Sequence, residues 1–133
     1  MAGAPCPAVP SSIADQLRER TFNYALRILR YCRGLPHDDE TREIRGQLLR
    51  AGMGVSGNYW SACRGRSTAE FIARLGVAED EAAESVMWLM LILRSGTRED
   101  PETKDLLQEG RELTAILSTS VKTARENRRR RKL

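Results

Sequence analysis

The chain has 133 residues, of which 30% are charged, and its formal net charge is +4 at pH 7. This length fits a single domain with one modest core. No apolar run approaches the roughly 20 residues of a membrane-spanning helix, and the first residues lack the basic and apolar segments of a secretory signal. Three widely spaced cysteines, without a CxxC pair, argue against a disulfide framework or a zinc site. We therefore expect a cytoplasmic protein that has no contact with membranes.

The sequence pattern is helical from residue 13 onward, after a leader (residues 1–12) that we expect to be flexible. Apolar residues recur every three or four positions and predict four helices. The predicted helices span about 13–34, 39–64, 67–95 and 101–125. Ser67 and Glu70 have the spacing of a capping box, and Pro101 suits the first turn of the fourth helix. Short turns then predict an all-α, antiparallel up-down four-helix bundle over residues 13–124, followed by a basic tail (125–133).

The second predicted helix contains GMGVSG at residues 52–57, which has the glycine spacing of a dinucleotide-binding turn. Such a turn follows a buried strand, whereas here the helical apolar spacing runs through the motif. Glycine inside a helix is unfavourable, so we expect it to serve close packing with another helix or with a second subunit. Gly54, Gly57 and Ser61 would form this stripe of small residues, with Gly65 as its next member. No bound cofactor is expected.

Several elements together resemble a known family. They are Gln47-Leu48-x-Arg50-Ala51, Val55-Ser-Gly-Asn58, Arg66-Ser67-x-x-Glu70-Phe71, Leu75-Gly-Val-Ala and Trp88-Leu89. Over residues 17–117 this set resembles the four helix bundle protein family, first known from open reading frames in intervening sequences of bacterial large-subunit ribosomal RNA genes. Many members carry Glu and Gly where this chain has Ser61 and Ala62, so no role of that Glu is carried over.

The resemblance implies a bundle that assembles as a ring-shaped homopentamer and has no assigned enzymatic activity. A related group of proteins serves as accessory protein to the reverse transcriptase of diversity-generating retroelements. In that group a basic surface of the pentamer helps to engage the polymerase and the nucleic acid. These properties are what the resemblance implies and are expectations for this chain.

Charge is unevenly distributed along the chain. Residues 13–66 carry ten basic and six acidic side chains, residues 67–124 carry six and eleven, and the segment RENRRRRKL at the end carries six and one. Opposite charge on the two halves favours contact within the chain or between copies, and clustered arginines favour contact with phosphates. The candidate residues for binding nucleic acid or a partner are Arg42, Arg45, Arg50, Arg64, Arg66, Arg125, Arg128, Arg129, Arg130, Arg131 and Lys132. Tyr59 and Trp60 beside these arginines would stack on bases or, as we favour, pack at a subunit contact.

Two polar residues lie close to apolar stripes and need partners there. We expect Asn58 to bond across helices and Glu70 to complete the cap at Ser67, with ligand contact as the alternative for both. Phe71 belongs with Ser67 and Glu70 to the structural set at the start of the third helix.

The sequence offers no catalytic constellation. His37 is the single histidine and cannot supply the paired Glu-x-x-His motifs of a di-iron bundle. The carboxylates between Glu79 and Glu84 have the spacing of a solvated helix face, so no metal is expected. We therefore predict a non-enzymatic scaffold or adaptor that binds RNA, DNA or a nucleic-acid enzyme such as a reverse transcriptase. The alternative is an assembly module that binds only protein and has a solubilising tail.

Overall fold

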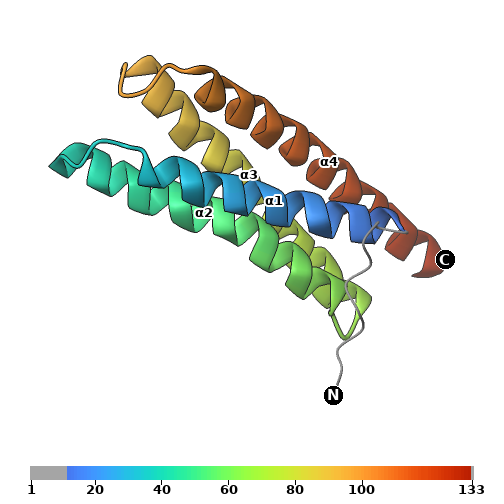
Figure 1. Cartoon of the computed structure of the whole chain (residues 1–133). Coiled ribbons are helices and arrows are strands. Elements are labelled where there is room, and N and C mark those ends of the chain that lie inside the picture. Colours follow the sequence, from blue (N-terminus) through green and yellow to red (C-terminus); the bar gives the residue numbers. More distant parts are fainter. Residues whose placement is uncertain (1–11, 133) are drawn as a thin grey trace.

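The structure, a computed structural model, describes residues 12–132 and is all-helical, with no strand in that range. Its four helices are α1 (Ile13–Arg33), α2 (Asp39–Cys63), α3 (Thr68–Arg94) and α4 (Pro101–Lys132). Consecutive helices run in opposite directions and pack side by side, whereas α1 and α4 meet over a much smaller contact (Figure 1). The chain is therefore a four-helix bundle, as the sequence predicts.

Each helix begins at a capping side chain that accepts a hydrogen bond from an otherwise unpaired backbone N–H. The four capping residues are Ser12, Asp38, Ser67 and Asp100. At the start of α2, Asp38 Oδ1 accepts from the Thr41 N–H at 2.8 Å. Hydrogen bonding with Thr41 holds the pKa of the Asp38 carboxyl below its usual value. All four helix starts are thus specified by local sequence.

Helix α4 is longer than the sequence predicts. The predicted helix ends near residue 125, whereas α4 continues through the arginine run to Lys132. Arginine is a good helix former, and no Gly or Pro interrupts the segment. Positive charge in the last turn is also stabilised by the helix dipole. As far as Lys132, the segment predicted as a separate basic tail is therefore part of α4.

The core contains buried apolar residues from all four helices, among them Ile28, Leu48, Leu89 and Leu113, each 0% exposed. Two buried tyrosines place hydroxyl groups in this core, and both are satisfied across helices. Tyr24 Oη pairs with Ser85 Oγ at 2.8 Å, and Tyr31 Oη pairs with Thr103 Oγ1 at 2.7 Å. Burial raises the pKa of Tyr24 to about 12, so this hydroxyl stays protonated at neutral pH.

Two buried glycines let helices approach closely inside the chain. A Cβ at Gly52 would lie 2.8 Å from Ile28 Cγ2 of α1, and one at Gly110 would lie 2.6 Å from the hydroxyl of Tyr24. The GMGVSG segment lies wholly within α2, with helix on both sides of it. Packing therefore explains Gly52, and the backbone turn of a dinucleotide site is absent from this segment.

Within the described range, the four helices lack the combination of length and apolar content that crossing a membrane requires.

Candidate functional site

The bundle topology brings distant basic segments to one end of the molecule. The start of α1, the turn between α2 and α3, and the end of α4 all lie at that end (Figure 1). We call the basic residues of the turn and of the end of α4 the basic pole. They are Arg64, Arg66, Arg125, Arg128, Arg129, Arg130, Arg131 and Lys132. Eight of the eleven predicted binding residues are thus gathered by the fold.

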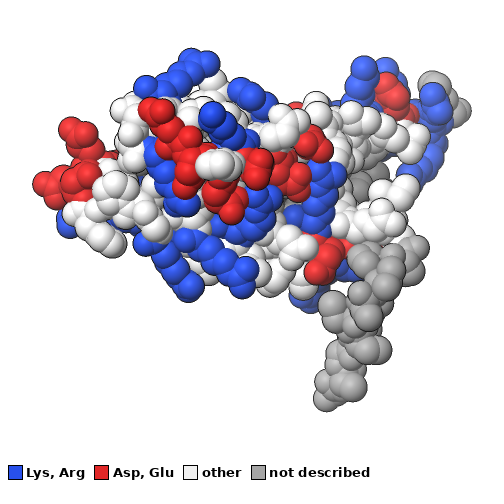
Figure 2. Space-filling model, turned by 45° about the horizontal axis from the view of Figure 1, so that its top comes forward, with Lys and Arg blue, Asp and Glu red and all other residues white. Residues whose placement is uncertain are grey.

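The side chains of the basic pole make no ion pair with any residue in the range 12–132. By contrast, several arginines elsewhere are neutralised locally, such as Arg27 by Glu102 at 2.6 Å. In Figure 2, acidic and basic side chains are interspersed over the middle of the face shown, and basic side chains predominate at the right-hand end, where α4 ends. The basic pole therefore presents uncompensated positive charge.

A cavity of about 550 Å³ opens at the basic pole. Arg66 from the α2–α3 turn and Arg131 from the last turns of α4 both line it, together with Tyr59 and Phe71. The two arginines are 65 positions apart in the sequence, so the cavity exists only in the folded bundle.

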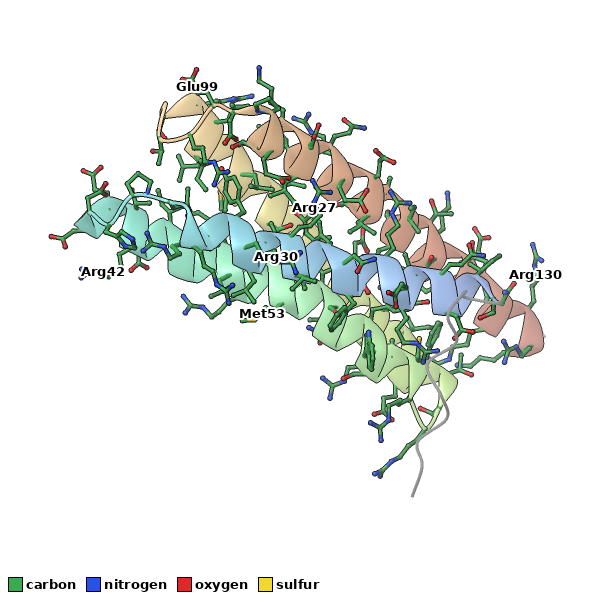
Figure 3. All side chains as sticks on the ribbon, in the orientation of Figure 1. Arg27, Arg30, Arg42, Met53, Glu99 and Arg130 are labelled. Carbon is green, nitrogen blue, oxygen red and sulfur yellow. The ribbon has the colours of Figure 1, made fainter. Side chains whose placement is uncertain are left out.

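Three of the predicted binding residues lie away from the basic pole. Figure 3 shows Arg42 and Arg130 at opposite ends of the molecule. Arg42 lies 3.6 Å from Asp39 in an exposed pair, and Arg50 is exposed midway along α2. Arg45 donates to the backbone carbonyls of Cys32, Leu35 and Pro36, so its guanidinium fastens the α1–α2 turn. Arg45 therefore has a structural role, which the sequence pattern did not indicate.

The structure also shows an apolar groove between α1 and α2, of about 270 Å³. It is lined by Phe22, Ala25, Leu26, Leu29, Met53, Ser56 and Gly57. Phe22 and Met53 are 48% and 47% exposed, and the ring of Trp60, 46% exposed, lies 6.2 Å from that of Phe22. The guanidinium of Arg18 lies 5.8 Å from the centre of the Trp60 ring. Exposed apolar groups gathered in this way are typical of protein contacts.

The predicted stripe of small residues on α2 does not face one partner. A Cβ at Gly54 would lie 2.8 Å from Glu81 Cδ of α3, so this glycine accommodates a side chain of the same bundle. A Cβ at Gly57 would meet no side chain and no other helix within 4 Å, and Ser61 is exposed. Asn58 donates to the Gly54 carbonyl of its own helix at 2.8 Å. The prediction that Asn58 bonds across helices is therefore wrong, because its side-chain amide donates to the carbonyl one turn earlier in the same helix.

The start of α3 has the cap that the sequence predicts. Ser67 Oγ accepts from the Glu70 N–H at 3.1 Å, and Glu70 Oε2 accepts from the Arg66 N–H at 3.0 Å. The Phe71 N–H donates to the Ser67 carbonyl at 3.0 Å, while the half-buried Phe71 side chain packs against the core. These bonds fix the α2–α3 turn, and with it the position of Arg66.

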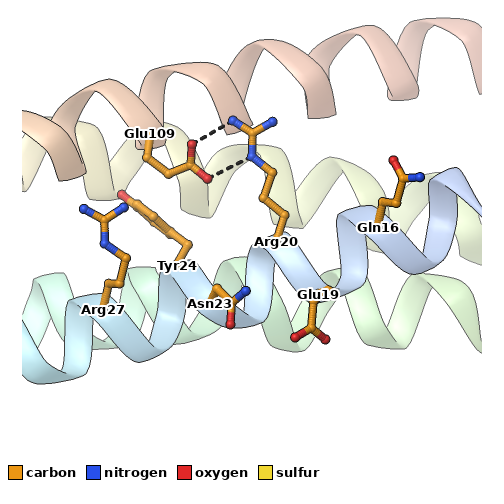
Figure 4. A pocket seen from close by; sticks show the side chains of 7 residues that line it. All are labelled: Gln16, Glu19, Arg20, Asn23, Tyr24, Arg27 and Glu109. Atoms are coloured by element: carbon orange, nitrogen blue, oxygen red, sulfur yellow. Dashed lines mark hydrogen bonds and ion pairs between the residues drawn. The ribbon is translucent and has the colours of Figure 1, made fainter. Parts of the chain in front are cut away.

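A second groove, of about 320 Å³, lies between α1 and α4, where the two helices are joined by charged side chains (Figure 4). Arg20 of α1 donates two hydrogen bonds to Glu109 of α4, at 2.7 and 2.8 Å. Hydrogen bonding to Glu109 raises the pKa of Arg20 above its ordinary value. Both arginines of this groove, Arg20 and Arg27, are therefore paired with glutamates of α4.

No cluster of His, Cys, Asp and Glu suited to a metal ion occurs in residues 12–132. Burial raises the pKa of the Cys32 thiol to about 11, so this cysteine stays protonated and unreactive at neutral pH. Glu81 has a raised pKa, caused first by desolvation and then by repulsion from Glu84 and Asp80. Its carboxyl lies over Gly54.

Comparison with known proteins places the fold in a family. Residues 15–119 match the model of the 23S rRNA-intervening sequence protein. The chain belongs to this family. No curated protein gives a significant match. Among solved structures, the chain resembles one from Bacteroides thetaiotaomicron VPI-5482, described as a protein of unknown function from the S23 ribosomal protein family.

That structure is 24% identical to the chain, with a TM-score of 0.75, and the match covers 82% of this chain and 97% of the other. At this identity the likeness concerns the fold alone. Membership of the intervening-sequence family and the four-helix fold thus agree with the sequence-based prediction, and the likeness leaves the family's activity open.

Proposed function

We propose that the protein is a non-enzymatic, cytoplasmic scaffold or adaptor that binds nucleic acid, or a nucleic-acid enzyme such as a reverse transcriptase, through the basic pole. One observation carries this proposal. Two segments far apart in the sequence, represented by Arg66 and Arg131, converge on one cavity with guanidinium groups that no acidic side chain of the described range neutralises.

The mechanism is electrostatic. Each phosphate that meets an arginine or lysine releases condensed counterions, so affinity falls as salt rises. If all eight side chains of the basic pole met phosphates of a duplex, log affinity would fall against log salt with a slope of about −7. Fewer simultaneous contacts give a shallower slope. The slope therefore measures how much of the basic pole is engaged.

Self-association is the second part of the proposal, and the α1–α2 groove supports it. On α2, Arg50 precedes and Arg64 follows the exposed residues Met53, Gly57 and Trp60. These five residues lie on one face of the helix, because each is three or four positions after the one before it. On α3 the exposed Val77, Met87 and Leu91 share a face with Asp80 and Glu84 by the same spacing.

The two surfaces are both apolar and carry opposite charge, which favours contact between α3 of one copy and the groove of the next. Such a head-to-tail contact forms a ring if its rotation closes. Five copies in the ring is what the resemblance to the family implies.

Binding is tested by fluorescence anisotropy with RNA and DNA at two salt concentrations. Deleting residues 125–133 leaves the last buried residue of α4, Val121, in place, so the core remains. We expect the deletion to weaken binding and reduce the salt slope. A matched pair is Arg130→Ala and Arg42→Ala, two exposed arginines at opposite ends of the molecule (Figure 3); only the first should weaken binding. Unchanged affinity and slope after the deletion would favour the solubilising role of the segment instead.

Assembly is tested by light scattering during gel filtration. Gly57→Leu adds bulk to the groove at a position where a Cβ would meet no side chain and no other helix within 4 Å, so the subunit should fold normally. We expect a smaller assembly with unchanged helix content. If Gly57→Leu leaves the molar mass unchanged, the groove is not the contact between copies.

A further inference from the structure

The cavity at the basic pole contains more than positive charge. Arg66 and Arg131 line it from two sides, and Asn127 adds an exposed side-chain amide from α4. Among the described residues that line it, none is Asp or Glu. None of these three side chains has a hydrogen-bond or ion-pair partner within residues 12–132. The cavity thus offers cations and an amide to a ligand from outside.

The same cavity has an apolar part. It is lined by the buried residues Tyr59 and Ala62, which are 5% and 2% exposed, and by the half-buried ring of Phe71. A volume of about 550 Å³ lies within the range of roughly 300–1,000 Å³ that is usual for small-ligand sites. The cavity therefore combines a planar apolar surface with cations around it.

Three backbone N–H groups around the start of α3 already have partners. The N–H groups of Glu70 and Phe71 are bonded to Ser67, and that of Arg66 is bonded to Glu70. Thr68, in the first turn of α3, also lines the cavity, and the two guanidinium groups of Arg66 and Arg131 supply its positive charge.

We propose that this cavity holds one unpaired nucleotide of a single-stranded nucleic acid. The phosphate lies between Arg66 and Arg131, the base lies against Phe71, and the amide of Asn127 meets the edge of the base. Aromatic rings bind unpaired bases regardless of sequence because every base has a flat apolar face. The proposal rests on the proposed function, since it names which nucleic acid the basic pole prefers.

A duplex fits this site less well. Its bases are paired and stacked, so only its phosphates reach the basic pole, and the apolar part of the cavity stays empty. An acidic peptide would likewise satisfy the arginines and leave Phe71 without a stacking partner. The aromatic lining therefore favours a single strand over both.

The test compares a short labelled single strand with the blunt duplex of the same sequence, using the full chain and anisotropy. We expect the single strand to bind about tenfold more tightly, the contribution of one stacked base. Ala124→Trp places a ring in the cavity without altering charge. It should lower single-strand affinity to that of the duplex and leave the salt slope unchanged. Ala115→Trp, at an exposed position of the same helix outside this cavity, is the control and should behave as the wild type.

Circular dichroism checks that each variant is folded. If Ala124→Trp unfolds the chain, Asn127→Ala is tested instead, since the exposed side chain of Asn127 has no partner within the described bundle. Asn127→Ala should reduce the preference for the single strand by about threefold, which corresponds to the loss of one weak hydrogen bond. Equal affinity for strand and duplex, unaffected by either variant, overturns the nucleotide site but leaves the proposed function standing. Tighter binding of a polyglutamate peptide than of the single strand by the wild type also overturns it. Absence of all salt-dependent binding refutes both.

Discussion

Gly52→Ala tests whether close packing between α1 and α2 explains the glycine in the middle of α2. The added Cβ would lie 2.8 Å from Ile28 Cγ2 and 3.0 Å from Ile28 Cβ. A rotamer change cannot move Ile28 Cβ, which is attached directly to the backbone, and the side chain is fully buried. The helices must therefore separate slightly, and overpacking of this kind costs about 1–3 kcal/mol.

The same substitution also removes the cost of glycine inside a helix, which is about 1 kcal/mol. The net effect is a loss of about 1 kcal/mol of unfolding free energy, between roughly 0 and 2. Gly46→Ala is the matched control in the same helix, because the nearest side-chain atom to its Cβ would be Arg50 Nη1, 3.9 Å away. Only the helix-propensity gain applies there, so Gly46→Ala should stabilise the chain by about 0.5–1 kcal/mol.

Urea unfolding followed by circular dichroism measures both changes. The expected difference between the two variants is about 1–3 kcal/mol, with Gly46→Ala the more stable. Equal stabilisation by both substitutions would refute the packing explanation, because it would show that the contact with Ile28 does not limit the approach of α1 to α2.

Three further predictions concern the bundle itself. Arg45→Met removes the donor to three backbone carbonyls of the α1–α2 turn and should cost about 1–3 kcal/mol in urea unfolding; a loss within error would show that water replaces the guanidinium. Ser67→Ala removes the cap of α3 and should cost about 1 kcal/mol, with Ser61→Ala, exposed in α2, as the neutral control. Glu81 has a folded-state pKa raised above 4.5, so the folded chain binds its proton more tightly and the contribution of Glu81 to stability falls as pH rises through that raised pKa. Glu81→Gln should therefore be more stable than the wild type at neutral pH and lose this advantage below pH 4.5, and a constant difference across this range would contradict the raised pKa.

The helices could be predicted from the sequence because the signals for them are local. Apolar spacing and capping residues such as Ser67 act within one or two turns, and the structure has helices where these signals lie. The sequence could also have predicted that Arg66 and Arg131 lie near each other, since antiparallel helices of these lengths bring both segments to the same end. The role of Arg45 could not be predicted from the sequence, because its carbonyl partners depend on how the α1–α2 turn folds.

Other features depend on how the helices are rotated about their axes, which the sequence pattern leaves open. Phe22 and Trp60 belong to helices whose apolar stripes are wider than the core can cover, and only the packed bundle shows that they meet at the surface. In the same way, Gly54 contacts Glu81 while Gly57 is open, although both belong to one predicted stripe. The end of α4 was predicted too early because an arginine run is compatible with helix and with tail alike.

Helix α4 continues for eleven residues beyond Val121, its last buried residue, which is about 16 Å of rod at 1.5 Å per residue. Successive side chains on such a helix are turned by about 100°, so its positive groups point in several directions, and Arg131 among them lines the cavity shared with the α2–α3 turn. A stiff, flat surface can touch those on one flank alone. A thin, flexible polyanion can bend around the exposed sides of the helix and contact more of them. The shape of this extension therefore favours flexible partners as well as negatively charged ones.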